Sequence, residues 1–280
     1  MTLVLAATPL GNPLDASARL KKAIESAEII AAEDSRRFHR LASDLEVTFT
    51  ARIISFFEGN EKERTAEILT LLREGKEVLV VTDAGMPTIS DPGFRLMRDA
   101  IAENLPIVVI PGPSAPMMAI ALSGLPTDRF TFEGFLSRSA GARQSHLESL
   151  RFEERTMIFF EAPHRITECL TDALEIFGGD RRAAICREMT KRYEETIRGT
   201  LEQLATWSTS NEVLGEITIV IAGAATDSAA LTAADMVARV REFEAAGMDR
   251  KTAIATVADE FGIAKRLVYA AVVDANKMSQ

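Results

Sequence analysis

The chain has 280 residues, of which 47% are hydrophobic and 26% charged, and this composition excludes a disordered or fibrous protein. Its formal net charge of −9 argues against a protein that coats nucleic acid non-specifically, although a local basic patch remains compatible with it. The longest apolar runs, at 29–32 and 157–160, have the length of a strand and not of a membrane span. The N-terminus lacks the basic and apolar regions of a signal peptide. We therefore expect a cytoplasmic protein.

Residues 1–124 alternate short apolar runs with segments of helical period, which is typical of an α/β domain with a largely parallel sheet. The expected strands lie at 2–8, 27–33, 52–56, 77–83 and 106–112. The expected helices lie at 17–27, 36–43, 61–75, 93–104 and 115–124. In such sheets ligands bind where strands end and helices begin, so the strand ends are the first places to search for a site.

Residues 125–224 have longer strand-like segments with a helix at 164–178, and they predict a second domain with a mixed sheet. The expected strands lie at 128–135, 156–162, 183–189, 193–201 and 215–223. The turn-rich stretch GLPTD at 124–128 is the expected junction between the two domains.

Residues 225–280 are expected to form a small helical domain. The small residues at 224–231 are typical of a linker, and a helix is expected at 236–247. Residues 249–276 predict two helices around the turn EFGIAKR, in the manner of a helix-turn-helix. The charge of this part is balanced and no helix is rich in arginine, so we do not expect it to bind DNA. It either contacts RNA or the ribosome, or packs on a dimer partner or on its own chain.

Cysteine and histidine give no sign of a metal site. The two cysteines, Cys169 and Cys186, have the spacing of neither a zinc site nor a disulfide framework, so we expect buried, reduced thiols. The histidines His39, His146 and His164 are scattered and form no HxxxH pair.

Three glycine-bearing loops each follow an apolar strand: TPLGN at 8–12, DAGMP at 83–87 and PGPSA at 111–115. Glycine allows a sharp turn or the close approach of a ligand, and all three loops are expected at the same edge of the parallel sheet. Asp83 stands at the mouth of the second loop, and Ser114 is placed to cap the next helix. Each loop alone has an ordinary structural explanation, and Asp83 also suits a turn-capping role. No loop has the glycine pattern of a dinucleotide or ATP site, which disfavours NAD and ATP.

A series of segments in order carries a resemblance to a known family. They are ATPLGNPLD, AAEDSRRFHRLASDL, TDAGMPTISDPGFRL, IPGPSA, SGLPTDRFTFEGFL, FFEAPHRI, REMTKRYEETIRGTL and GEITIVIAG. Together they resemble the ribosomal RNA small subunit methyltransferase I family, of the tetrapyrrole-methylase-like class of S-adenosylmethionine-dependent methyltransferases, over residues 3–223. Met86 and Thr88 depart from the family's more usual threonine and aliphatic residue, and FFEGNEKER at 56–64 is a loose version of its segment.

The resemblance implies a two-domain α/β fold with the cofactor S-adenosyl-L-methionine in the interdomain cleft, and a homodimer. It also implies transfer of a methyl group to the 2′-hydroxyl of a cytidine in 16S ribosomal RNA of the small subunit. The residues expected to bind the cofactor come from both domains. They are Leu10, Gly11, Asp83, Ala84, Gly85, Met86, Ser114, Ala115, Ala162, Met189 and Ile217.

Methyl transfer from a sulfonium needs alignment of the reacting atoms and exclusion of water, and a ribose hydroxyl reacts better when a base draws off its proton. The candidates for this base lie in three of the matched segments, and the sequence does not rank them. They are Glu33, Asp34, Glu161, His164, Glu188 and Lys191.

Clustered basic residues beside these segments are expected to bind the phosphates of the RNA. The predicted RNA-binding residues are Arg36, Arg37, Arg40, Arg138, Arg143, Arg165 and Arg192, with Arg187, Lys191 and Arg198 nearby. The alternative for each of them is a solvated surface charge or an ion pair within the protein. Trp207 and the phenylalanine pairs at 56–57 and 159–160 are expected in the core and not as platforms for base stacking.

Two other functions compete with this interpretation. A methyltransferase of the same fold can act on a tetrapyrrole or corrinoid, or on a modified histidine of an elongation factor, because one fold hosts many acceptors. A non-enzymatic, ribosome-associated module that senses a small ligand is the second alternative. SDPG, LPTDRF and EAPHR match the ribosomal branch more closely than these alternatives.

Overall fold

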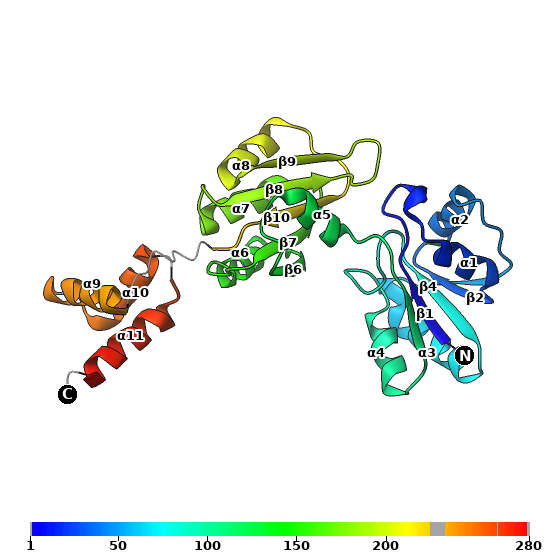
Figure 1. Cartoon of the computed structure of the whole chain (residues 1–280), viewed down its shortest axis with the longest axis horizontal. Coiled ribbons are helices and arrows are strands. Elements are labelled where there is room, and N and C mark those ends of the chain that lie inside the picture. Colours follow the sequence, from blue (N-terminus) through cyan, green and yellow to red (C-terminus); the bar gives the residue numbers. More distant parts are fainter. Residues whose placement is uncertain (1, 225–232, 262, 279–280) are drawn as a thin grey trace.

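The computed structural model of the chain describes residues 2–224, 233–261 and 263–278 (Figure 1). Nearly all of the predicted linker at 224–231 lies outside these residues. Within the ranges just given, no helix combines the length and the apolar character needed to cross a bilayer.

The first part of the chain forms a parallel sheet with the strand order β3-β2-β4-β1-β5. The strands are β1 (Thr2–Ala6), β2 (Ile29–Ala32), β3 (Arg52–Ser55), β4 (Glu77–Val81) and β5 (Ile107–Ile110). The helices are α1 (Ala18–Ser26), α2 (Ser35–Asp44), α3 (Glu61–Arg73) and α4 (Phe94–Ala102), with 3-10 turns η1 (Pro13–Asp15) and η2 (Glu58–Asn60). The predicted parallel sheet is confirmed, because apolar strands of this kind are buried on both faces and joined by helices.

Alternate residues of each strand point to opposite faces, and each face has its own core. Leu3 and Leu5 of β1 pack with α3 and α4, whereas Val4 and Ala6 pack with α1 and α2. This two-sided packing leaves the carboxyl ends of β1 and β4 free to carry loops at one rim of the sheet.

The second sheet is mixed, as predicted, with the strand order β6-β7-β10-β8-β9. Its strands are β6 (Phe130–Phe135), β7 (Thr156–Glu161), β8 (Arg182–Arg187), β9 (Glu195–Thr200) and β10 (Ile217–Ile221). β6 and β7 run parallel, and the other pairs are antiparallel. Its helices are α5 (Ala115–Ser123), α6 (Ala140–Ser149), α7 (Ile166–Phe177) and α8 (Leu201–Ser210).

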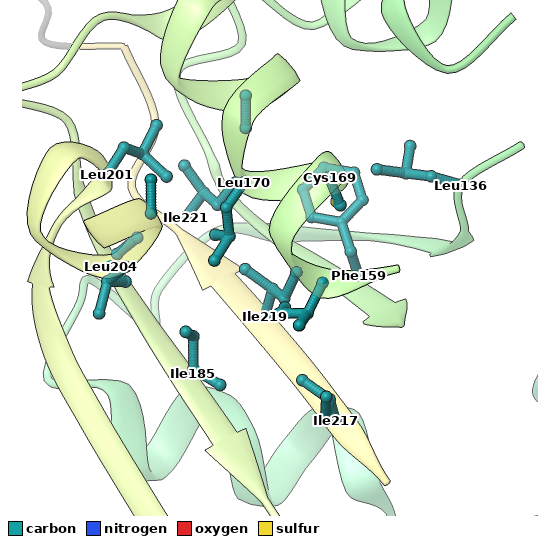
Figure 2. Packing of buried hydrophobic residues seen from close by; sticks show 14 of the residues in the cluster. Leu136, Phe159, Cys169, Leu170, Ile185, Leu201, Leu204, Ile217, Ile219 and Ile221 are labelled. Carbon is teal, nitrogen blue, oxygen red and sulfur yellow. The ribbon is translucent and has the colours of Figure 1, made fainter. Parts of the chain in front are cut away.

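The core of this second part forms where α7 and α8 cover one face of the sheet (Figure 2). Ile217, Ile219 and Ile221 alternate along β10 and all point into this core, together with Phe159 of β7 and Leu170 of α7. The period of two in this strand therefore fixes which face the helices cover.

Helix α5 covers the opposite face of the same sheet. Its Ala119 and Ile120 pack against Ile158, Cys186 and Val220. The boundary drawn at residue 124 from the sequence places α5 with the first sheet, whereas its packing is with the second. Periodicity shows that a helix has an apolar face, but it does not show which sheet that face meets.

The C-terminal helices α9 (Ala233–Ala245), α10 (Arg250–Glu260) and α11 (Lys265–Met278) share a core of their own. Val240 of α9, Val257 of α10 and Val268 of α11 are buried in it. Asp249 accepts hydrogen bonds from the N–H groups of Lys251 and Thr252 and so begins α10. The two helices expected around the turn EFGIAKR are confirmed as α10 and α11.

Candidate functional site

A cavity of about 390 Å³ lies where the strand ends of the first sheet face the second sheet. Its first wall comes from the loops after β1 and β4 and from the start of α5. Its second wall comes from the end of β6, the loop after β7, the segment after β8 and the start of β10. The volume is in the range of sites for small molecules and cofactors.

The three glycine-bearing loops converge at this cavity, as predicted. Thr8 and Gly85 exchange backbone hydrogen bonds of 2.8 and 3.1 Å, which join the first loop to the second. Gly85 has a φ of +81°, and a side chain there would also stand 3.3 Å from Leu10. The third loop is held by the bond from the Ala7 N–H to the Ile110 carbonyl, and a β-carbon on Gly112 would lie 2.9 Å from that of Ala7. Glycine is therefore required for the loops to meet so closely.

Most residues predicted to bind the cofactor line this cavity. They are Leu10, Asp83, Ala84, Gly85, Met86, Ser114, Ala115, Ala162, Met189 and Ile217. Gly11 is not among the lining residues. It packs instead against Lys191, because a β-carbon there would stand 2.3 Å from Cγ of that lysine.

Carboxylates gather on one side of the cavity. The Asp83 N–H donates to Glu33 Oε2 at 3.1 Å, and Asp83 Oδ1 accepts from the Asp34 N–H at 3.2 Å. Arg37 Nη1 lies 3.1 Å from Asp83 Oδ2. Burial raises the pKa of Glu33 and of Asp83, and repulsion between neighbouring carboxylates adds to both shifts. This group thus contains more carboxylates than the single positive charge of Arg37 can neutralise.

Asp91 has the largest shift in this group. Burial, followed by repulsion from Glu33 and Asp83, raises its pKa to about 7. Such a carboxyl is half protonated near neutrality and would ionise when a cation arrives. Asp91 was not among the predicted site residues, although it lies in the segment SDPG, which carries part of the family resemblance. The positive φ values of Thr88 and Ser90, +80° and +63°, fold this loop back over the cavity.

Apolar side chains form most of the remaining wall. Met86 and Ile89 contribute from the loop after β4, and Phe135 and Phe160 contribute from β6 and β7. Phe135 is 56% exposed, which is unusual for an aromatic ring on a strand and marks a surface that a ligand can cover. Ile89, Phe135 and Phe160 were not predicted. For the two phenylalanines, which lie on β6 and β7, strand periodicity alone does not separate a cavity wall from a core.

The candidates for a catalytic base divide into two groups. Glu33 and Glu161 line the cavity, whereas His164, Glu188 and Lys191 do not. The Glu161 side chain has no exposed surface; its Oε1 accepts from the Ala162 N–H at 2.8 Å and lies 3.3 Å from Arg165 Nε. Asp34 accepts hydrogen bonds from the N–H groups of Arg36 and Arg37 and begins α2. Asp34 therefore has a clear structural role, whereas Oε2 of Glu161 is buried without a hydrogen-bond partner.

Glu188 and Lys191 belong to a strap, residues 188–191, in the connection between β8 and β9. Glu188 and Thr190 have positive φ values of +50° and +66°. Lys191 Nζ lies 2.9 Å from Glu188 Oε1 and 3.0 Å from Glu216 Oε2. Burial favours a higher pKa for Glu188, but the bonds from Lys191 and the Glu216 N–H outweigh it and lower that pKa. The strap also accepts a hydrogen bond from the Asn12 N–H on Thr190 Oγ1 at 3.2 Å, so it ties the two walls together.

The predicted RNA-binding arginines lie in different environments. Arg36, Arg40, Arg138 and Arg192 are exposed, and Arg37 lines the cavity. The prediction for Arg143 is wrong: its side chain is only 3% exposed and pairs with Asp172 and Glu168 of α7. The prediction for Arg165 is also wrong, since its 12% exposed side chain pairs with Glu161 and donates to the Leu136 and Ser137 carbonyls. Sequence clustering could not reveal that these two arginines point inward.

Among the described residues, no group of three or more histidine, cysteine or acidic side chains is arranged to hold a metal ion. Cys169 and Cys186 are buried free thiols.

The chain matches a family profile and named relatives over most of its length. Residues 2–205 match the profile of the family described as Tetrapyrrole (Corrin/Porphyrin) Methylases. A Mycobacterium bovis protein named Ribosomal RNA small subunit methyltransferase I is 46% identical over 276 residues, which are 98% of this chain and 95% of that protein. A Thermotoga maritima protein of the same name is 43% identical over 221 residues, 79% of this chain and 98% of that protein.

A solved structure shares the fold. The crystal structure of uroporphyrin-III C-methyltransferase from Thermus thermophilus, complexed with S-adenosyl homocysteine, has a TM-score of 0.56 and 15% sequence identity. The match covers 79% of this chain and 96% of that one. At this identity the likeness shows the fold alone.

Proposed function

Because the chain belongs to the ribosomal RNA small subunit methyltransferase I family of S-adenosylmethionine-dependent methyltransferases, we propose that it methylates the 2′-hydroxyl of a cytidine ribose in 16S ribosomal RNA. The observation that carries this proposal is the cavity itself, in which glycine-bearing loops of one sheet face an apolar wall of the other. The cofactor, when bound, supplies a methyl group that is already activated by a positively charged sulfur.

The residues of the cavity suit this cofactor chemically. S-adenosylmethionine carries an ammonium and a sulfonium against one carboxylate, so a site with excess carboxylate is electrostatically complementary to it. Asp91 and Asp83 are placed to receive the cationic groups, and Met86 and Ile217 offer apolar contact. Ser114 begins α5 with no hydrogen bond from its own side chain, so its hydroxyl and the first N–H groups of the helix are available to polar atoms of the ligand.

Glu33 is the carboxylate best placed to take the proton from the ribose hydroxyl. It lines the cavity and its pKa is raised above the ordinary value, mainly by burial, which makes it a stronger base than an exposed carboxylate. Asp83 is engaged by Arg37, and Glu161 is fully buried. The bond from the Asp83 N–H to Glu33 Oε2 fixes the orientation of the Glu33 carboxylate and leaves Oε1 for the substrate.

The RNA would approach over the start of α2. This helix begins directly after Glu33 and Asp34 and exposes Arg36 and Arg40. Their nearest carboxylates, Asp34 and Asp44, lie 3.9 Å away and are themselves partly exposed, so these pairs are weak and open to exchange for phosphates.

A homodimer is part of the proposal, and an exposed apolar edge supports it. Val108 and Val109 of the edge strand β5 are 40% and 45% exposed, and Ile101 of the neighbouring α4 is 58% exposed. Adjacent strand residues point to opposite faces, so neither face of β5 is covered at this point. Apolar edge strands of this kind associate readily, and a second copy of the chain is the proposed cover. Action on ribosomal RNA also implies a cytoplasmic protein.

The proposal is tested by mapping ribose methylation in the ribosomal RNA of cells with and without this protein. We expect a single cytidine of the small subunit to lose its 2′-O-methyl group, and expression of the wild-type chain to restore it. A Glu33→Gln variant should fail to restore the mark although it still binds the cofactor in calorimetry. An unchanged map would eliminate the proposed function. The tetrapyrrole alternative would then regain priority, since the fold alone is compatible with it.

A further inference from the structure

Helix α11 presents a basic and aromatic face that methyl transfer does not use. Lys265 and Arg266 open the helix, and Tyr269 follows one turn later. Their spacings of three and four residues place the three side chains together on one face, and all three are exposed, Tyr269 to 60%. Val268 and Val272 lie on the other side of the helix and are buried against α9 and α10. We call Lys265, Arg266 and Tyr269 the α11 face.

The cations of the α11 face have no ion-pair partner within the described residues, whereas two of the other cations of the same helical unit do. Arg239 pairs with Glu242 and Glu260, and Arg250 pairs with Glu244. Positive charge in the first turn of a helix also opposes the helix dipole. Neither local stability nor ion pairing therefore accounts for Lys265 and Arg266.

We infer that the unit α9–α11 is an RNA-binding module, and that its α11 face contacts the backbone of the small-subunit ribosomal RNA. This inference rests on the proposed function for the identity of the RNA. Lys265 and Arg266 bind phosphate oxygens, and the Tyr269 ring packs on a sugar or a base. Helix α11 begins at Lys265, shortly after α10 ends at Glu260, and the side chains at its start are exposed, as in helix-turn-helix modules.

The chemistry of the α11 face favours RNA over a protein partner. Protein interfaces have an apolar centre depleted of charge, whereas here charges accompany the aromatic ring. The whole chain carries a net charge of −9, so RNA is repelled at long range and local cations are needed to hold it. A module that adds such cations away from the cavity meets that need.

The position of the unit in the chain agrees with an accessory role. It lies outside residues 2–205, which match the methylase family, and the Thermotoga maritima relative is covered almost entirely by 221 matched residues. Methyl transfer therefore belongs to the two sheets, and the helical unit adds affinity for the substrate.

The test compares the full-length wild type with Lys265→Ala/Arg266→Ala and Tyr269→Ala. The matched control is Arg19→Ala/Lys22→Ala on α1, which removes the same charge from exposed positions in the first part of the chain. The probe is small ribosomal subunits purified from cells that lack this protein. Binding is measured over a range of potassium chloride concentrations, methylation is measured at saturating cofactor, and cofactor affinity is measured by calorimetry.

We expect the double α11 variant to bind the subunits about tenfold more weakly, with a salt dependence reduced by roughly two released counterions, because two phosphate contacts are lost. Tyr269→Ala should weaken binding by a similar factor with the salt dependence unchanged. Cofactor affinity and the control should match the wild type. Equal subunit affinity and equal salt dependence in the α11 variants would overturn the inference. A loss of affinity in the double variant that leaves the salt dependence at the wild-type value would also overturn it, because that result indicates a ribosomal protein as the partner.

The two hypotheses fail separately. A wild type that binds the subunits through the α11 face but methylates nothing in them refutes the proposed function and leaves the RNA-binding module standing. A wild type that methylates the subunits, together with α11 variants that do so with the same KM, refutes the module and leaves the proposed function standing.

Discussion

Individual carboxylates determine the electrostatic potential of the cavity. Asp83 is one of them, and it interacts with two partners. Its Oδ1 accepts from the Asp34 N–H and its Oδ2 pairs with Arg37. Removing it frees the Arg37 cation inside the site that is proposed to bind a cationic cofactor. The sequence indicated Asp83 because it follows a strand and precedes a glycine turn, but it gave no sign of the pair with Arg37, which needs α2 folded beside β4.

We expect Asp83→Ala to lower the affinity for S-adenosylmethionine about tenfold in calorimetry, since an attraction is replaced by a repulsion at short range. The control is Asp44→Ala, which removes another arginine-paired carboxylate outside the cavity and should leave cofactor affinity unchanged. An unchanged affinity of Asp83→Ala would return this residue to a purely turn-capping role.

Asp91 makes cofactor binding depend on pH. Its pKa of about 7 means that in the free protein it is largely protonated at pH 6 and largely ionised at pH 8. A cationic ligand favours the ionised form, so affinity should rise from pH 6 to pH 8 and then level off. In Asp91→Asn the affinity should be lower at pH 8 and nearly independent of pH in this window. A wild-type affinity that is flat over the same range, measured by calorimetry, would contradict this role.

The same shift has a consequence for the stability of the free protein. The folded-state pKa of Asp91 lies above the ordinary value of 3.8, so the folded chain holds the proton more tightly than the unfolded chain between these values. The contribution of Asp91 to stability is therefore most favourable at low pH and is lost as the pH rises toward 7. Asp91→Asn should raise the Tm of the ligand-free protein more at pH 8 than at pH 5. A larger gain at pH 5 would show that the sign is reversed.

At the scale of elements, the sequence predicted the strands, the helices other than α6 and α8, and the convergence of three loops, because apolar periodicity and glycine are local signals. It did not predict the strap at 188–191, in which the non-glycine residues Glu188 and Thr190 adopt positive φ. Such a conformation persists only when contacts distant in sequence hold it, here with Glu216 and Asn12. Arg143 and Arg165 were misjudged for the same reason, since their partners come from other elements.

The strap predicts a specific effect at Gly11, which touches it from the opposite wall. In Gly11→Ala the new β-carbon would stand 2.3 Å from Lys191 Cγ, so the lysine must move away from Glu188 and Glu216. Because Met189 and Glu216 line the cavity, we expect the KM for the cofactor to rise about five- to tenfold, in line with the loss of about 1 kcal/mol of preorganisation.

The matched control is Gly141→Ala in α6, where nothing lies within 4 Å of the added carbon. This variant should keep the wild-type KM and gain a little stability, since alanine is favoured over glycine in a helix. If Gly11→Ala behaves like Gly141→Ala in steady-state kinetics, then the strap does not transmit strain to the cavity.

At the scale of the whole molecule, β5 is an edge strand of the first sheet, and Val108 and Val109 on it are exposed. Edge strands with exposed valine are avoided in monomeric proteins, because their free N–H and C=O groups pair with other chains. The edge of β5 and the neighbouring surface of α4 are therefore the proposed site of dimerisation. Nothing in the sequence reveals this edge, since β5 has the same apolar pattern as the buried strands β1 and β4.

We expect the wild type to be a dimer at micromolar concentration in light scattering. Val108→Lys and Val109→Lys should each raise the Kd of dimerisation at least tenfold, because a desolvated charge in the interface is unfavourable. The control is Leu14→Lys, which places the same charge at an apolar side chain that is 90% exposed and lies outside the edge of β5. Circular dichroism should show that all three variants remain folded. The dimer proposal would be contradicted by a monomeric wild type. It would also be contradicted if Leu14→Lys dissociated as much as Val108→Lys and Val109→Lys. The edge of β5 would then be expected to be covered by the ribosomal subunit.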